Sequence, residues 1–195
     1  MKVSIVEYQP EWRKMFETEK GILQTTLREV LSRIEHIGST AVAGLAAKPI
    51  IDLMIGLEDF SIADQVVPKI EASGYEYIQK YEAVMPFRRF FIKEQSGIRT
   101  HQIHMVGMGG EFWERLILFR DYLRRNPGVA EQYASLKRGL AEREWEDVNE
   151  YADAKTEFIR GIENKAKGQV SRNGAASQPV EPDAQSASLS SRTYR

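Results

Sequence analysis

A short polar turn and a carboxylate inside an apolar segment are the residues best suited to chemistry in this sequence. Gly38, Ser39 and Thr40 form the turn, and twelve residues separate Ser39 from Asp52. Backbone N–H groups of such a turn hold anions, and glycine lets a ligand approach the main chain closely. A lone carboxylate in an apolar strand costs on the order of several kcal/mol unless it is paired, hydrogen-bonded or bound to a metal. The pattern therefore predicts either a phosphate site with a divalent cation beside it, or an ordinary turn with Asp52 paired to Lys48 or an arginine.

Histidines and adjacent arginines form a second group of polar candidates. The three histidines, His36, His101 and His104, all lie in strand-like segments, which indicates one shared polar site. On a regular strand His101 and His104 point to opposite faces, so both ligate one ion only if a bulge intervenes. Arg88 and Arg89 also point to opposite faces, so at most one guanidinium faces a given phosphate. Structural histidines and a solvated arginine are the alternative for these residues.

The elements that must position these residues form a mixed α/β body. Residues 49–57 are nearly all apolar, which suits a strand buried on both faces, and Asp52 is their single charged residue. Ser96-Gly97 predicts the turn of a hairpin. Further strands are expected at 3–8, 33–37, 75–80, 88–93 and 99–106, and helices at 10–32 and 61–73.

From Glu111 onward the pattern is helical. Three apolar stripes at helical spacing predict three C-terminal helices, and the charge-rich run 137–147 is expected to be the exposed face of one of them. The predicted fold class is thus α/β (α+β), with a mixed sheet of four to six strands, flanking helices and a C-terminal three-helix segment.

Composition and charge restrict the class of protein. The chain has 195 residues and a net charge of −1, with 42% hydrophobic and 28% charged residues, which is ordinary for a globular domain. A protein that coats polyanions would be basic, so extensive nucleic-acid binding is disfavoured. The lack of cysteine excludes disulfides and thiolate metal sites. Residues 1–166 are expected to form one domain, and the Ser/Ala-rich residues 167–195 a disordered tail.

The sequence also predicts the compartment. A charge interrupts the N-terminal segment after six residues, so we expect no signal peptide. No apolar run approaches the roughly 20 residues that a membrane helix needs. We therefore expect a cytoplasmic protein without a membrane partner.

Beyond these general features, several motifs resemble the GrpB-like family. The resemblance rests on residues 33–40 (RIEHIGST) and 44–52 (GLAAKPIID), and it continues in order through residues 99–104 (RTHQIH), 133–137 (YASLK) and 155–159 (KTEFI). It covers about residues 5–165. The resemblance implies a nucleotidyltransferase-type fold whose Gly-Ser turn and following aspartate correspond to the phosphate and metal elements. The family also occurs fused to dephospho-CoA kinases in some bacteria, and the resemblance implies no particular substrate, because none is established for the family as a whole.

One position departs from the pattern of active nucleotidyltransferases. These enzymes usually carry a second carboxylate two residues after the first, where this chain has Met54. Two-metal phosphoryl transfer needs several anionic ligands, and a thioether is a poor ligand for Mg²⁺. His104, His101 or Glu35 would have to complete the shell of a divalent metal, which would be Mg²⁺, Mn²⁺ or Zn²⁺.

Two functions are consistent with these residues. The leading hypothesis is an enzyme that transfers a nucleotidyl or phosphoryl group, with Asp52 as metal ligand and His104 as a further ligand or general base. The alternative is a non-catalytic nucleotide- or CoA-type binding module that serves a partner protein. In both cases a nucleotide or another phosphate-bearing small molecule is the expected ligand. Its phosphate contacts would come from Gly38, Ser39, Thr40, Lys48, Arg88 and Arg89, with His36 as a further polar candidate.

Overall fold

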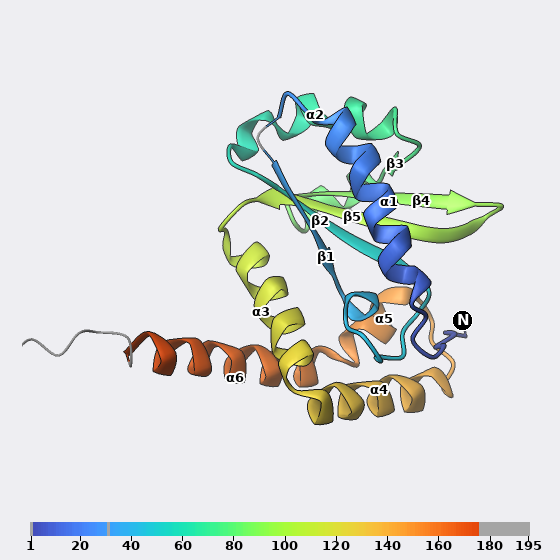
Figure 1. Ribbon diagram of the computed structural model, residues 1–195. Coiled ribbons are helices and arrows are strands. Elements are labelled where there is room, and N and C mark those ends of the chain that lie inside the picture. The colour runs from blue at the N-terminus through green and yellow to red at the C-terminus, as the bar shows by residue number, and fades with distance from the viewer. Residues whose placement is uncertain (1, 31, 176–195) are drawn as a thin grey trace, which may run out of the picture.

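The fold is built on one mixed sheet. The structure, a computed structural model, describes residues 2–30 and 32–175. Its five strands lie in the order β1-β2-β5-β4-β3 (Figure 1). β2 and β5 are parallel, whereas the other neighbouring strands are antiparallel. The strands span Ser32–Ile37 (β1), Ile51–Leu57 (β2), Glu76–Tyr77 (β3), Arg88–Gln95 (β4) and Ile98–Gly107 (β5).

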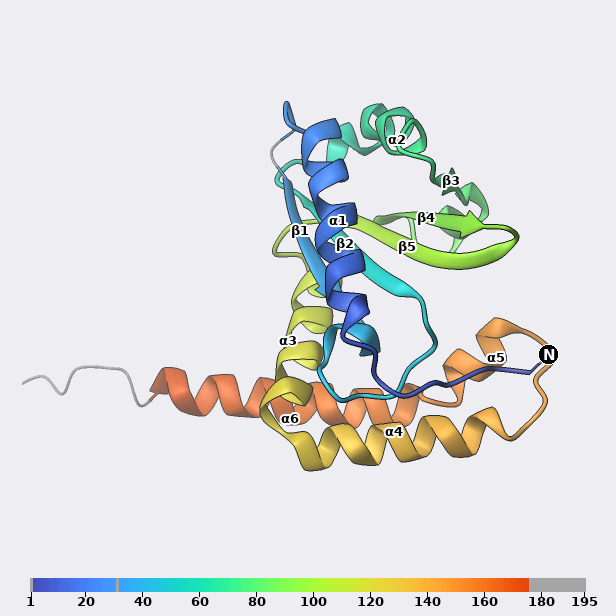
Figure 2. The ribbon, with the colours of Figure 1, turned by 45° about the vertical axis from the view of Figure 1, so that its right-hand side comes forward.

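Six α-helices accompany the sheet in the described part of the chain. They span Glu11–Thr26 (α1), Ala63–Glu71 (α2), Glu111–Arg125 (α3), Pro127–Ala141 (α4), Val148–Asp153 (α5) and Thr156–Ala175 (α6). Figure 1 shows α1 and α2 on one side of the sheet, whereas α3 leads away from the sheet to α4–α6. In Figure 2 α4 and α6 lie at the end of the molecule away from α2. The predicted α+β class, a mixed sheet with flanking helices, is confirmed.

Successive side chains of β2 point to opposite faces of the sheet, and different helices pack on each face. The odd-numbered residues of 51–57 are fully buried and pack with α1 and α2 in the main apolar core. Asp52, Met54 and Gly56 point to the opposite face, toward α3 and the helices that follow it. Gly56 is needed there because a Cβ atom at this position would overlap the ring of Trp113 on α3. Strand β2 thus places Asp52 on the side of the C-terminal helices.

The predicted hairpin between β4 and β5 is confirmed. Ser96 and Gly97 at its turn have φ angles of 53° and 75°, the positive values that two-residue hairpin turns favour. The register shifts between Lys93 and Glu94. In this fully described hairpin the shift does not fall between His101 and His104, so the two histidines face opposite sides of the sheet.

Several predicted elements differ from the structure. Residues 3–8 contribute only an isolated bridge between Val6 and Ala47. The expected strand at 75–80 is reduced to β3, because a 3-10 turn at Gln79–Ala83 takes the chain off the edge of the sheet. The last apolar stripe is divided between α5 and α6, so four helices follow β5 where three were expected.

The first part of the expected disordered tail is helical. Helix α6 continues to Ala175, so residues 167–175 are helical. Residues 176–195 of the expected tail lie outside the described residues. Among the helices that the structure describes, none combines the length and the apolar character that crossing a bilayer requires.

Candidate functional site

A cleft of about 780 Å³ lies beside the N-terminal ends of the parallel strands β2 and β5. Ser39, Thr40, Lys48 and Asp52 all line this cleft, so four of the predicted site residues come together. Its other polar walls come from β5 and the C-terminal helices, and include Arg99, Gln102, Tyr133, Lys137, Tyr151 and Lys155. We call this site the lysine cleft.

The turn before β2 lies directly against Asp52. Gly38 has a φ angle of 70°, in the left-handed region where other residues are strained. A Cβ atom on Gly38 would overlap the carboxylate of Asp52. The next residues form a single 3-10 turn at Ser39–Ala41, in which the Thr40 hydroxyl donates a hydrogen bond to the Ile50 carbonyl at 3.2 Å. Glycine at position 38 thus allows the turn and the carboxylate to meet.

Gln102 is the direct partner of Asp52. The two residues are paired across β2 and β5, and the Gln102 amide donates a hydrogen bond to the carboxylate. Burial raises the pKa of Asp52 to about 6, although the Gln102 amide and the charges of Lys155, Lys137 and Lys48 oppose the rise. The sequence left open whether Asp52 pairs directly with Lys48 or an arginine. In the structure its direct partner is instead the Gln102 amide, and three lysines surround the pair.

Three lysines converge on this carboxylate. Lys137 is only 3% exposed, and its Nζ atom donates to Ser39 Oγ at 2.9 Å and to a backbone carbonyl. Burial and the charge of Lys155 lower the pKa of Lys137 to about 7. Burial and the charge of Lys48 lower the pKa of Lys155 to about 8. These ammonium groups have lost much of their hydration, and an anionic group supplies the charge-assisted hydrogen bonds that replace it.

Two tyrosine rings hold the lysines in place. Lys155 Nζ lies 4.0 Å and Lys48 Nζ 4.4 Å from the centroid of Tyr151. Lys137 Nζ lies 4.6 Å from the centroid of Tyr133. Aromatic faces attract cations, and both rings are buried. The ammonium groups therefore have fixed positions and still carry donors for a ligand.

The side chains of the lysine cleft do not fit a two-metal centre. Within residues 2–30 and 32–175, no three histidine, aspartate or glutamate side chains gather as metal ligands. Met54, in the place of the second carboxylate, is fully buried and packs with Val106 and Trp113. The three lysines around Asp52 would also repel a divalent cation. Positive charge, which metal ions supply in phosphoryl transfer, is present here as ammonium groups.

His104, Arg88 and Arg89 lie outside the lysine cleft. His104 shares a sheet face with Asp52, but its Nδ1 atom is 3.1 Å from Arg88 Nη1, and its ring is 5.1 Å from that of Phe90. Arg89 forms ion pairs with two carboxylates, at 2.7 and 3.1 Å. None of the three lines the cleft, so the structure does not bring them to the phosphate turn.

The other predicted residues lie elsewhere too. His101 is buried on the face of the sheet that α1 covers. Glu35 forms an ion pair with Arg120 at 2.7 Å. His36 stacks on Phe16 with 4.5 Å between ring centroids, and burial lowers its pKa to about 3. The expectation of one polar site shared by the three histidines is wrong, and the expected metal shell is not assembled by these side chains.

Comparison with known proteins identifies the family. Residues 2–165 match the family described as GrpB protein. The chain belongs to the GrpB family. The glutamate-rich protein GrpB of Alkalihalophilus pseudofirmus is 34% identical over 167 residues, which cover 84% of this chain and 95% of that protein. The UPF0157 protein YqkA of Bacillus subtilis is 38% identical over 178 residues, 89% of this chain and 51% of that protein. The chain therefore spans about half the length of YqkA.

A solved structure of a GrpB protein has the same fold, and other proteins are more distantly similar. Dephospho-CoA kinase of Mycolicibacterium paratuberculosis is 25% identical over 187 residues, 84% of this chain and 46% of that protein. The crystal structure of conserved protein GrpB from Enterococcus faecalis superposes with a TM-score of 0.75 at 37% identity, covering 86% of this chain and 99% of that chain. A cytoplasmic RNA terminal U-transferase aligns at a TM-score of 0.48 and 16% identity, over 73% of this chain and 43% of that chain. This last likeness is too small for a functional argument.

Two of the three lysines of this cleft, Lys137 and Lys155, were not among the residues predicted from the sequence. The run 137–147 was expected to be exposed, but Lys137 is buried. A signal was present, because Lys137 follows Tyr133 by four residues and Lys155 follows Tyr151 by four residues. Residues four apart on a helix share a face. Each lysine thus follows a tyrosine of an apolar stripe, and Lys137 shares the buried face of α4 with its tyrosine.

Proposed function

We propose that the lysine cleft binds the phosphate groups of a nucleotide- or CoA-type small molecule. The observation that carries this proposal is the convergence of the ammonium groups of Lys48, Lys137 and Lys155 around the Asp52 carboxylate, with Glu94 as the other carboxylate that lines the cleft. Among the residues that the structure describes, none of the three lysines forms an ion pair, whereas a polyphosphate supplies matching negative charge. The cleft volume of about 780 Å³ lies in the range of small-molecule sites.

The residues around the lysines also contribute to the proposed phosphate binding. The Ser39 hydroxyl accepts from Lys137, and a serine hydroxyl can also donate a hydrogen bond to a phosphate oxygen. Asp52, whose pKa is raised to about 6, is partly protonated near neutral pH and then repels an anion less. Arg99 also lines the cleft and adds a further cation. The ligand is therefore held by side chains alone, and the proposal assigns no part of this binding to a metal.

Transfer of a nucleotidyl or phosphoryl group is the second candidate function, and Asp52 favours it. A carboxylate with a pKa near the working pH is suited to accept a proton from an acceptor hydroxyl. The lysines would stabilise the negative charge on the oxygens of the transferred group. The similarity to a dephospho-CoA kinase adds CoA compounds to the ligands worth testing.

A thermal-shift screen of the full chain tests the proposal. The ligands are the nucleoside triphosphates, CoA and dephospho-CoA, each in EDTA and with Mg²⁺, Mn²⁺ or Zn²⁺. A ligand at 100 times its dissociation constant stabilises the folded state by about 2.7 kcal/mol. We expect a shift that persists in EDTA, decreases in Lys155→Met and is retained in Lys165→Met, whose lysine is exposed on α6. No shift with any of these ligands would contradict the proposal.

Turnover separates the two functions. Product formation from the ligand that binds, abolished by Asp52→Asn with binding retained, supports the transferase. Binding without turnover across hydroxyl and amine acceptors, with or without metal, contradicts the transferase and leaves the binding function standing.

A further inference from the structure

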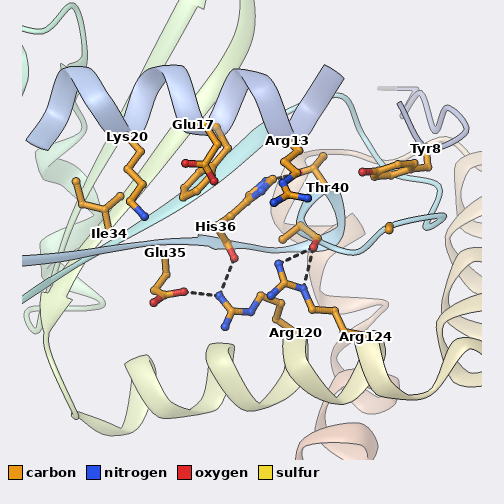
Figure 3. A pocket seen from close by; sticks show the side chains of 13 residues that line it. Tyr8, Arg13, Glu17, Lys20, Ile34, Glu35, His36, Thr40, Arg120 and Arg124 are labelled. Carbon is orange, nitrogen blue, oxygen red and sulfur yellow. Dashed lines mark hydrogen bonds and ion pairs between the residues drawn. The ribbon is translucent and has the colours of Figure 1, made fainter. Parts of the chain in front are cut away.

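A second cleft lies on the other side of the turn that carries Thr40. It has a volume of about 510 Å³, and Figure 3 shows it between α1 and α3, with β1 running between the two helices. Thr40 lines both clefts, and the other lining residues are different. We call this site the arginine cleft, and nothing in the proposed function uses it.

Four basic side chains meet in the arginine cleft. Arg13 and Lys20 extend from α1, and Arg120 and Arg124 extend from α3 toward the same space (Figure 3). Burial and the charges of Arg120 and Arg13 lower the pKa of Arg124. Cations from two helices are therefore close enough to repel one another.

Internal contacts account for the two arginines of α3. Arg120 Nη1 donates to Glu35 Oε2 at 2.7 Å and to the His36 carbonyl at 3.0 Å. Arg124 donates through Nε and Nη2 to the Ala41 carbonyl, at 3.0 and 2.8 Å. These contacts fix both guanidinium groups against the end of β1 and the turn that follows it.

The cations of α1 have no such partners. In the part of the chain that the structure describes, neither Arg13 nor Lys20 forms an ion pair, and Lys20 lies 5.7 Å from the centroid of a phenylalanine ring. Glu17 and Glu35 line the cleft, and Asp121 contacts both α3 arginines. On the α1 side of the cleft, Arg13 and Lys20 face the single carboxylate of Glu17, which leaves one positive charge uncompensated there.

We propose that the arginine cleft binds a small molecule through a phosphate monoester group, with Arg13 and Lys20 as its principal contacts and Arg124 opposite them. A guanidinium matches phosphate oxygens with two parallel hydrogen bonds. A phosphate accepts donors from several directions, as cations on two facing helices require, whereas a planar carboxylate does not. A small molecule is favoured over a nucleic-acid strand because Glu17 lies within the cleft and would repel a continuous polyanion.

A site-resolved titration tests this assignment. The ¹⁵N-labelled full chain is titrated with inorganic phosphate at pH 7, and the amide shifts around α1 and around the lysine cleft are fitted separately. We expect saturable shifts at residues 13–20, weakened about fivefold in Arg13→Gln and in Lys20→Gln, which is the size of one exposed ionic contact. Lys14→Gln is the matched control, because Lys14 is exposed on the same helix and does not line the cleft.

Each other outcome has a defined meaning. Absence of saturable shifts at residues 13–20, or shifts unchanged in Arg13→Gln and Lys20→Gln, overturns the proposal. Equal affinity for acetate overturns the assignment of phosphate as the ligand group. Arginine-dependent binding of a 5′-phosphorylated oligonucleotide at least about tenfold tighter than phosphate overturns the small-molecule assignment. Lys155→Met should leave the shifts at residues 13–20 unchanged, so failure of the lysine cleft to bind does not bear on this result.

Discussion

Replacing Gly38 by alanine tests the contact between the turn and Asp52 that forms the lysine cleft. Gly38 has a φ angle of 70° and a ψ angle of −170°, a conformation that is essentially restricted to glycine and costs another residue about 1–3 kcal/mol. The new Cβ atom would also overlap the Asp52 carboxylate, and such overpacking costs about 1–3 kcal/mol. We therefore expect Gly38→Ala to lower the free energy of unfolding by about 2–6 kcal/mol. Urea denaturation followed by circular dichroism measures this change.

Gly44→Ala is the matched control. Gly44 has a φ angle of 78°, and a Cβ atom there would have no neighbour within 4 Å, so only the conformational cost of about 1–2 kcal/mol is expected. In an Asp52→Ala background, Gly38→Ala should cost only its conformational part, which gives a coupling free energy of about 1–3 kcal/mol. Absence of this coupling to Asp52 would refute the placement of the turn against the carboxylate.

Three further predictions concern packing, charge and lysine positioning. Gly56→Ala should destabilise the fold by at least about 2 kcal/mol in the same assay, because its Cβ atom would overlap Trp113; a loss below about 0.5 kcal/mol would contradict the packing of α3 on the sheet. Sulfate, whose charge is constant, should bind the lysine cleft more weakly from pH 5 to pH 9 in calorimetry. The reason is that Asp52 gains negative charge near pH 6 and Lys137 loses positive charge near pH 7, and a constant affinity would exclude this charge balance. Tyr151→Leu should weaken the same sulfate binding about fivefold, because its ring holds two lysine ammonium groups; unchanged binding by a folded variant would show that the ring has no such part.

Those parts of the fold governed by a single local rule could be predicted from the sequence. The apolar run at 49–57 identified β2, which spans 51–57 in the structure, and Ser96-Gly97 identified the turn between β4 and β5, because each pattern permits few alternatives. The length of β3 was not predictable, since an edge strand depends on how far its neighbour pairs with it. The break between α5 and α6 was missed because an apolar stripe continues across it.

The residues of the candidate site could likewise be predicted from the sequence only in part. Asp52 was identified as a polar residue in an apolar strand, and Ser39 lies in the turn preceding that strand. Lys137 reaches Ser39 from 98 residues away, and only the folded chain shows that α4 passes this turn. The histidines were grouped wrongly because shared polarity carries no information about which face of the sheet a residue occupies. His36 and His101 lie on the α1 face, and strand alternation could have separated them from Asp52.

The dissociation constant of pyrophosphate, measured by calorimetry in EDTA, tests the central claim most directly. The three proteins are the wild type, Lys155→Met and Lys165→Met, with circular dichroism to establish that each is folded. A hydrogen bond to a charged group contributes about 1.5–3 kcal/mol, so Lys155→Met should bind at least about tenfold more weakly than the wild type. Lys165→Met should match the wild type within about twofold. Equal dissociation constants for all three proteins would contradict the claim that the lysines of this cleft hold phosphate groups.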